Sequence, residues 1–325
     1  MPVLLAGADA VTADATVAAV IDAWRNGRPV LLPTETGYAV VHGRADAVRC
    51  VADAAALERQ VGPLPDDLRR ILMRAWPGPV CVSHGGLAYR SPVSLLVEEG
   101  MRAGLKLDID ESTEADTTID RLAGLRGEAL AVILDAGTLS PQALTVIEMA
   151  GGGWAMSRAG AIDQTALLEL AARWIVFVCT GNTCRSPMAE ALARKTLADR
   201  LGCEPGELVS RGYRVLSAGV AAGDGDAASG EAVEAVRTLG ASLDEHRSQL
   251  LGVDLVAQAD ELIAMTRGHL LAILTRYPAI GGTMRLLGGV GGDVNDPIGG
   301  PPEMYVACAA KIHEYVERLS KELVR

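Results

Sequence analysis

The chain has 325 residues, a net charge of −11 at pH 7 and a sequence pI near 5.0, and 49% of its residues are hydrophobic. This length favours two domains, and the acidic balance argues against a general affinity for nucleic acid or for an anionic membrane surface. The sequence has no charge-free apolar run of about 18 residues and no secretory signal pattern, so we expect a cytoplasmic protein that does not span a membrane.

The cysteine and aromatic contents further limit the class of protein that this sequence can form. The six cysteines are too sparse for a disulfide scaffold and contain no Cys-x-x-Cys pair, which argues against a zinc ribbon or a thioredoxin-type site. Aromatic residues make up only 3% of the chain, so the cores must consist mainly of Ala, Val, Leu and Ile. Such a composition suits layered α/β packing.

Four segments of the first half point to a known domain. They read LLPTETGYAVV at 31–41, AWPGPV at 75–80, ILDAGTL at 133–139 and SRAGAI at 157–162. In this order they resemble the YrdC-like domain of threonylcarbamoyl-AMP synthases, which make the precursor of a modified adenosine in tRNA. The resemblance implies a YrdC-like α/β domain over residues 1–172. Its substrate-binding strand end would consist of Pro33, Thr34, Glu35 and Thr36.

Two parts of that family's site are missing. The segment LERQVGPL at 57–64 stands where the family has a Lys-x-Arg pattern, and Asn26 is the only asparagine of this half, so the family's Ser-x-Asn motif cannot be present. We therefore expect a domain that keeps the fold without the synthase chemistry and that can still bind a small-molecule ligand. An active tRNA-modifying synthase is the alternative, and the plainest interpretation of Thr34 and Glu35 is a strand end before a turn at Gly37.

A domain boundary is predicted near residue 172. The helical stretch TALLELAAR at 165–173 runs directly into the apolar strand candidate WIVFV at 174–178. We assign the second domain to residues 173–325.

Strand and helix patterns alternate in this second domain. We expect strands at 174–178, 213–217, 261–266 and 283–287, and helices at 187–201, between Ser229 and Gly240, around 248–257 and from 302 to 324. This alternation predicts a doubly wound, four-stranded parallel sheet that binds ligands at the C-terminal ends of its strands.

The segment CTGNTCRS at 179–186 lies between the first of these strands and the helix that opens with Pro187. A loop in this place turns its backbone N–H groups inward and adds the positive end of the following helix, so it can bind a dianionic phosphate group. Gly181 and Asn182 tolerate the left-handed backbone angles that such a loop requires. A nucleotide-binding phosphate loop is excluded because no Lys followed by Ser or Thr ends the segment.

The side chains of this segment suit nucleophilic chemistry. We expect the positive surroundings to favour the thiolate form of Cys179, Arg185 to grip two phosphate oxygens, and Ser186 to donate a hydrogen bond to the sulfur. The alternative is a small buried thiol at a strand end and a surface arginine. Residue type, spacing and strand-loop-helix context together favour the anion site.

Over about 174–325 the sequence resembles the low-molecular-weight protein tyrosine phosphatase family. Further landmarks in the family's order are Ser217-Ala218-Gly219, His246-Arg247-Ser248, Ala259-Asp260 and Asp296-Pro297. The resemblance implies that Cys179 attacks phosphorus, that Arg185 holds the phosphoryl oxygens, and that Asp296 protonates the leaving group and later activates water. It also implies a phosphate-binding loop of Thr180, Gly181, Asn182, Thr183, Cys184 and Ser186, supported by an Asn182–Ser217 hydrogen bond.

This mechanism needs neither a metal ion nor another cofactor, and its partner is a phosphorylated protein. Asp293 is the rival carboxylate to Asp296, and its simplest interpretation is a solvated loop residue. His246, His269 and His313 are scattered in the sequence, so we interpret each as a surface or packing residue rather than a metal ligand. An arsenate reductase on the same scaffold needs resolving thiols, and none lies between Cys203 and Cys308.

The sequence favours phosphoarginine over phosphotyrosine as the substrate. The segment 220–233 contains no aromatic residue that could hold a flat phenol ring, and Ile298 follows Asp-Pro. Thr183 matches the arginine phosphatase branch of the family, whereas the Phe common in that branch after Asp-Pro is replaced here. Asp224 and Asp226 either attract a guanidinium group or are solvated turn residues.

Overall fold

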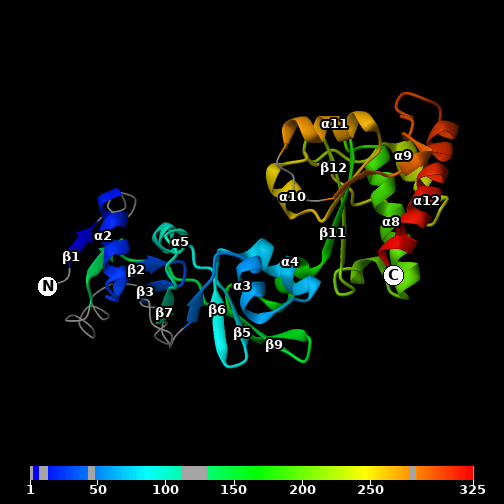
Figure 1. Ribbon diagram of the computed structural model, residues 1–325. Coiled ribbons are helices and arrows are strands. Elements are labelled where there is room, and N and C mark those ends of the chain that lie inside the picture. The colour runs from blue at the N-terminus through cyan, green and yellow to red at the C-terminus, as the bar shows by residue number, and fades with distance from the viewer. Residues whose placement is uncertain (1–2, 7–13, 43–47, 111–129, 279–282, 325) are drawn as a thin grey trace. The chain divides into compact units, whose positions relative to one another are not determined.

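A computed structural model describes residues 3–6, 14–42, 48–110, 130–278 and 283–324 (Figure 1). The chain divides into two compact units, Met1–Ala171 and Ala172–Arg325, each with its own sheet and its own core. Within the described ranges, none of the helices combines the length and the apolar composition that crossing a membrane requires.

In the first unit, ten strands of the described residues form one mixed sheet in the order β1-β8-β2-β3-β7-β4-β6-β5-β9-β10. The strands are β1 Val3–Ala6, β2 Val30–Thr34, β3 Gly37–His42, β4 Val48–Cys50, β5 Val80–His84, β6 Leu87–Arg90, β7 Asp108–Asp110, β8 Val132–Asp135, β9 Thr145–Ala150 and β10 Gly153–Arg158. The helices are α2 Asp14–Arg25, α3 Ala54–Val61, α4 Asp66–Ala75, α5 Leu95–Arg102 and α7 Gln164–Ala171. Helices α2 and α5 share one core cluster with β2, β3 and β8, while α3, α4 and α7 share another with β5 and β9. The first unit is therefore an α/β structure.

The second unit confirms the predicted four-stranded parallel sheet, with the strand order β12-β11-β13-β14. The strands are β11 Arg173–Cys179, β12 Tyr213–Gly219, β13 Glu261–Ala264 and β14 Thr283–Leu286. The helices are α8 Arg185–Leu201, α9 Gly230–Arg237, α10 Val253–Gln258, α11 Arg267–Arg276 and α12 Pro302–Leu323. Because all four strands run the same way, the segments after them meet at one edge of the sheet.

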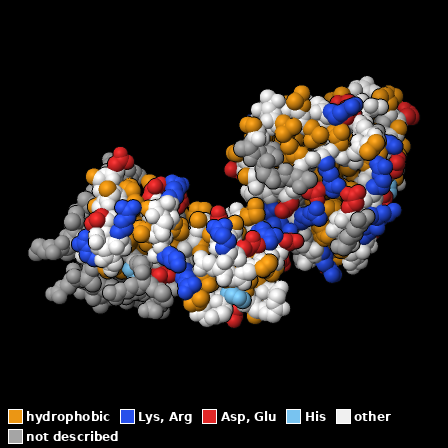
Figure 2. Space-filling view, in the orientation of Figure 1, with side chains coloured by type: hydrophobic (Ala, Val, Ile, Leu, Met, Phe, Trp, Pro, Cys, Tyr) orange, Lys and Arg blue, Asp and Glu red, His pale blue; other side chains and the backbone are white. Residues whose placement is uncertain are grey.

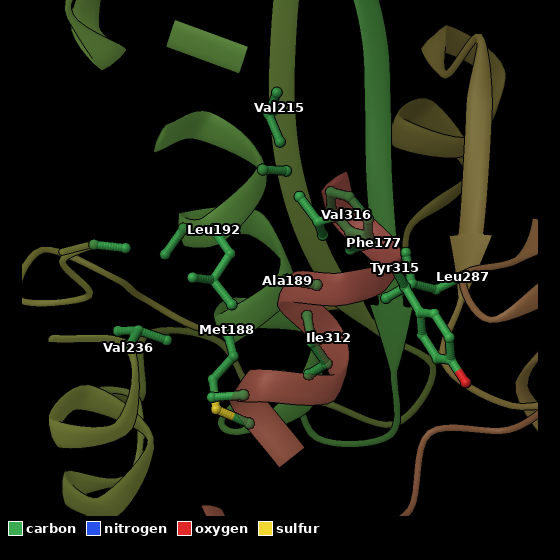
Figure 3. Close-up of a cluster of buried hydrophobic side chains, with 14 of the residues drawn as sticks. Phe177, Met188, Ala189, Leu192, Val215, Val236, Leu287, Ile312, Tyr315 and Val316 are labelled. Carbon is green, nitrogen blue, oxygen red and sulfur yellow. The ribbon is translucent and has the colours of Figure 1, made fainter. Parts of the chain in front are cut away.

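Strand β11 is buried on both faces and its side chains alternate between two cores. Ile175, Phe177 and Cys179 face the cluster built with α8, α9 and α12, whereas Val176 and Val178 face the cluster that includes residues of α10 and α11. Figure 3 shows Phe177 beside side chains of α8 and α12. Period-two alternation thus sends the Cys179 side chain to the face that α8 covers, the helix that begins at Arg185.

Helix α11 has an exposed apolar outer face and a buried inner face. Hydrophobic side chains gather on the surface over this helix (Figure 2), where Leu271 and Leu274 are 67% and 46% exposed. Its inner residues His269 and Ile273 are buried.

Several predicted boundaries differ from those of the structure. The helix expected around 248–257 is wrong at its start, because Ser248 instead holds a turn: its hydroxyl donates to Gly223 O (2.6 Å) and accepts from Asp226 N (3.0 Å). Ser229 does cap α9, since its hydroxyl accepts from Ala232 N (3.3 Å). Polar side chains of this kind compete with helix formation except at the cap position.

Candidate active site

The loop after β11 is held by its carbonyl groups. Cys179 O accepts from Val220 N (2.9 Å), and Thr180 O accepts from Ala221 N (3.0 Å). Further along, Thr183 O accepts from Ser229 N (2.9 Å). With these oxygens bound to the segment after β12, the peptide planes of the loop turn their N–H groups the other way.

These amide groups and the helix behind them form an anion-binding cradle. In the part of the chain that the structure describes, no protein acceptor receives a hydrogen bond from the backbone N–H groups of residues 181–185. Helix α8 begins at Arg185 and adds the positive end of its dipole at the same place. Unpaired backbone donors at a helix N-terminus bind phosphate-like anions.

Asn182 is the centre of the loop. It is fully buried and has φ +54°, a left-handed conformation that asparagine adopts more readily than most residues. Its Nδ2 donates to Ser186 Oγ (3.0 Å) and to Ser217 Oγ (2.8 Å), and its Oδ1 accepts from Gln249 N (2.9 Å). One side chain therefore ties the loop to the ends of two neighbouring segments.

The close approach of β12 to this loop requires a glycine. A Cβ atom at Gly219 would collide with Thr180 O and would lie 3.0 Å from Asn182 N. The Ser217-Ala218-Gly219 sequence thus supplies a hydroxyl to the loop and the space that the loop occupies.

Cys179 lies at the base of the cradle. Its Sγ is 2.9 Å from Ser186 Oγ, and the residue is 3% exposed. Ser186 in turn accepts from Asn182 Nδ2, and its hydroxyl proton has two acceptors within reach, the sulfur and Ala218 O (3.3 Å). A hydroxyl donor in this position stabilises sulfur as an anion.

The structure brings Arg185 and Asp296 together. Arg185 Nη2 forms an ion pair with Asp296 Oδ2, and its Nη1 donates to Val294 O (3.4 Å). Asp293, the rival carboxylate, instead accepts from the backbone and side chain of Arg267 (3.0 and 3.3 Å). Asp296 thus faces the loop, whereas Asp293 is bound to the first turn of α11.

Thr183 and Cys184 complete the loop beside α9 and α12. Cys184 is buried, with its Sγ 3.4 Å from Ser229 Oγ and 3.8 Å from Tyr305 Oη, and Thr183 Oγ1 lies 3.7 Å from the same sulfur. These contacts hold the loop against two helices of the core.

Two histidines that the sequence analysis set aside bind the loop. His246 Nε2 lies 2.8 Å from Asn182 O, which can only accept, so this nitrogen carries the proton. His269 Nε2 lies 2.9 Å from Thr180 Oγ1. Burial lowers the pKa of both imidazoles, that of His269 to about 4, to which the Arg185 charge also contributes. The sequence marked His246 only as part of the family landmark His246-Arg247-Ser248, and nothing marked His269.

Glu190 extends the network behind the loop. Its Oε2 accepts from Ser217 Oγ (2.6 Å), and the residue also lines a surface cavity of about 590 Å³ together with His246 and Gln249. Burial raises the pKa of Glu190, against the opposing effect of the Ser217 hydrogen bond.

The first-unit residues singled out from the sequence lie at the β2–β3 turn. Thr34 Oγ1 donates to Gly37 O (2.8 Å), and Arg90, which is fully buried, forms an ion pair with Glu35 and donates to Thr36 Oγ1 (3.1 Å). Pro33 is part of β2 itself. Among the described residues of the chain, His, Cys, Asp and Glu form no group of three or more that could hold a metal ion.

Comparisons with known proteins identify relatives of the second unit. Residues 174–325 match the family model described as low molecular weight phosphotyrosine protein phosphatase. The chain is 38% identical to a protein-arginine-phosphatase of Geobacillus stearothermophilus and 37% identical to one of Bacillus subtilis, in each case over 46% of this chain and 95% of the relative. It is 39% identical to a probable low molecular weight protein-tyrosine-phosphatase of Ralstonia nicotianae, over 35% of this chain and 70% of the relative.

The raised pKa of Glu190 predicts a pH-dependent stability. Since burial lifts this pKa above the usual 4.5, the folded state favours the neutral acid, and stability decreases as the pH rises from about 4.5 through the pKa in the folded protein. We expect Glu190→Gln to lack this loss, so that its unfolding free energy falls less than that of the wild type between pH 4.5 and 7.5. Urea unfolding of both proteins at the two pH values measures the difference, and parallel changes in the two proteins would contradict it.

Proposed function

Because the chain belongs to the low molecular weight phosphotyrosine protein phosphatase family through residues 174–325, and is therefore a cysteine-dependent protein phosphatase, we propose that its substrate is phosphoarginine in proteins. The observation that carries this proposal is the absence of aromatic residues from the segment 220–233, which is bound to the phosphate-binding loop. The reaction proceeds through a phosphocysteine intermediate.

In the first step Cys179 acts as the nucleophile. Its thiolate attacks phosphorus, a sulfur–phosphorus bond forms, and the bond to the leaving nitrogen or oxygen breaks. The loop amides and the fork of Arg185 bind the phosphoryl oxygens. Asp296, freed when Arg185 turns to the phosphoryl oxygens, takes up a proton from solvent and gives it to the leaving group, and its resting ion pair with Arg185 supports this place beside the phosphate.

In the second step Asp296 acts as a base. It takes a proton from a water molecule, the resulting hydroxide attacks phosphorus, and the sulfur–phosphorus bond breaks. Ser186, 2.9 Å from the Cys179 sulfur, donates to the departing thiolate. Phosphate leaves, Asp296 releases its proton to solvent, and Arg185 returns to the carboxylate.

The borders of the loop support an arginine substrate. The segment after β12 reaches the loop through Ala221 and Ser229, and it presents small and acidic residues rather than rings. Ile298, which follows Asp-Pro, is 68% exposed and offers an aliphatic surface without a stacking face. An alkyl chain that ends in a guanidinium group suits such walls better than a phenol ring.

The acidic residues of that segment have different environments. Asp224 Oδ1 accepts from Leu250 N (2.9 Å), which is the interaction of a turn residue. Asp226 is exposed, and its backbone is bound by Ser248. We therefore assign attraction of the guanidinium group to Asp226 and a structural role to Asp224.

Asp296 and Asp293 form a matched pair for testing the acid. Asp296→Asn removes the proton donor, so we expect kcat with phenyl phosphate to fall by roughly 10²-fold. The affinity for inorganic phosphate should rise several-fold, because Arg185 loses its internal partner. Asp293→Asn should leave both quantities near the wild-type values, with Cys179→Ser as the inactive baseline. Steady-state kinetics measure kcat, and inhibition by inorganic phosphate measures its affinity. Equal losses of kcat in the two Asp variants would rule out Asp296 as the acid.

Thr183 tests the choice of substrate. We expect Thr183→Val, which keeps the shape and removes the hydroxyl, to shift the ratio of kcat/KM for phosphoarginine and phosphotyrosine peptides toward phosphotyrosine by about tenfold, the effect of one hydrogen bond. Thr183→Ser should keep the wild-type ratio. A wild type that prefers phosphotyrosine, or two variants with the same ratio, would remove the basis for the proposal.

We further propose that the first unit is a YrdC-like domain without synthase activity. The residues that the resemblance assigns to substrate already have internal partners: Glu35 is bound by Arg90 and by Val93 N (2.8 Å), and Thr34 is bound to Gly37 O. These hydrogen bonds occupy the side-chain groups that the synthase reaction would require. Ligand binding without catalysis remains compatible with this arrangement.

The 325-residue chain should form no threonylcarbamoyl-AMP from threonine, bicarbonate and ATP. Radiolabelled threonine followed by separation of nucleotides measures the product, and a thermal-shift comparison with threonine or ATP reports binding alone. ATP-dependent transfer of the label into an adenylate would overturn the proposal.

A further inference from the structure

His269 forms a bridge between two hydroxyl groups at the edge of the loop. Its Nε2 lies 2.9 Å from Thr180 Oγ1, and its Nδ1 lies 3.0 Å from Thr266 Oγ1. The residue is 7% exposed, although Thr180 itself lies at the surface. Thr266 caps α11 by accepting from the backbone of His269 (3.3 Å), so the imidazole is held at a helix start.

The segment that carries His269 also binds the loop that carries the acid. Met265 N donates to Val178 O (3.0 Å), and Val294 N donates to Met265 O (2.8 Å). Two residues later, Arg267 binds Asp293 through its backbone and its side chain. Residues 265–269 therefore contact both the strand end before the nucleophile and the segment that leads to Asp296.

We propose that His269 is a positioning residue of the phosphatase reaction, which fixes Thr180, the residue after the nucleophile, relative to the loop that bears Asp296. The proposal rests on the phosphate-binding role of the loop and not on the identity of the phosphorylated side chain. Loss of the His269–Thr180 hydrogen bond frees the first peptide groups of the cradle, so both phosphate binding and transfer weaken.

The charge state of the imidazole fits this role. Its pKa of about 4 keeps His269 neutral at physiological pH, as burial and the Arg185 guanidinium require, while Asp296 and Asp293 act in the opposite direction. A neutral imidazole has one donor and one acceptor nitrogen, and a hydroxyl group can serve either. The bridge therefore adds no second positive charge beside Arg185.

Two amide variants separate positioning from packing. Glutamine places its terminal amide near the position of Nε2 and asparagine near that of Nδ1, so only His269→Gln can restore the bond to Thr180. We expect His269→Asn and His269→Ala to lower kcat/KM for p-nitrophenyl phosphate about tenfold and to weaken inhibition by inorganic phosphate to a similar degree. His269→Gln should stay within about twofold of the wild type. His313→Ala, a half-buried histidine on α12, is the control that leaves activity unchanged.

Thr180 provides the reciprocal test, and its surface position allows the chain to fold. Thr180→Val should show the loss of His269→Ala, Thr180→Ser should not, and the double variant Thr180→Val with His269→Ala should be no worse than either single variant. Equal activities for His269→Gln and His269→Asn, or additive losses in the double variant, would overturn the proposal. Because p-nitrophenyl phosphate is the substrate, a preference for phosphotyrosine peptides would contradict the proposed substrate without affecting this result.

Discussion

The left-handed backbone of a buried asparagine is the constraint on which the site depends. Asn182 cannot adopt φ +54° inside the protein without compensation, and its side chain provides this by binding Ser186, Ser217 and Gln249. Each of these partners belongs to a different segment of the second unit. The left-handed backbone of this residue is thus stabilised by contacts that exist only when the fold around it is complete.

The pairing of Arg185 with Asp296 gives the resting site a balance of charge. A guanidinium group in a mostly buried position needs an anion, and Asp296 provides it until a phosphoryl group takes its place. In the proposed mechanism this exchange frees the carboxylate, which then takes up a proton from solvent before it gives one to the leaving group.

The sequence was informative where chemistry and local backbone preference coincide. The segment 179–186 could be interpreted because its glycine, asparagine, cysteine and arginine each have a physical reason to occur in a phosphate-binding loop, and the four-stranded sheet followed from alternating apolar runs. The family resemblance then placed Asp296. The helix expected to start near Ser248 failed because a serine side chain that bonds to a distant turn gives no sign of it in the sequence.

The contacts of the two histidines beside the loop also could not be predicted from the sequence. His246 is partly buried and His269 is buried, and they bind loop atoms 64 and 89 residues away in the sequence. Their contacts depend on how α11 and the segment before α10 fold against the sheet, which local patterns do not encode. In the first unit the internal partner of Glu35, the buried Arg90, was equally unforeseen, since arginine is ordinarily a surface residue.

Helix α12 is the last element of the second unit to leave the ribosome, and this order affects when the active site can form. It comes after every other element of the second unit, yet Tyr305 contacts Cys184 of the loop, and Cys308 donates to Asn295 O beside the acid. Its residues Ile312 and Val316 also close the core over Phe177 (Figure 3). A nascent chain that has exposed the nucleophile but not yet α12 therefore lacks both the wall behind the loop and the support of Asp296. We therefore expect the loop and Asp296 to gain these contacts only after α12 has been synthesised and has packed against the core.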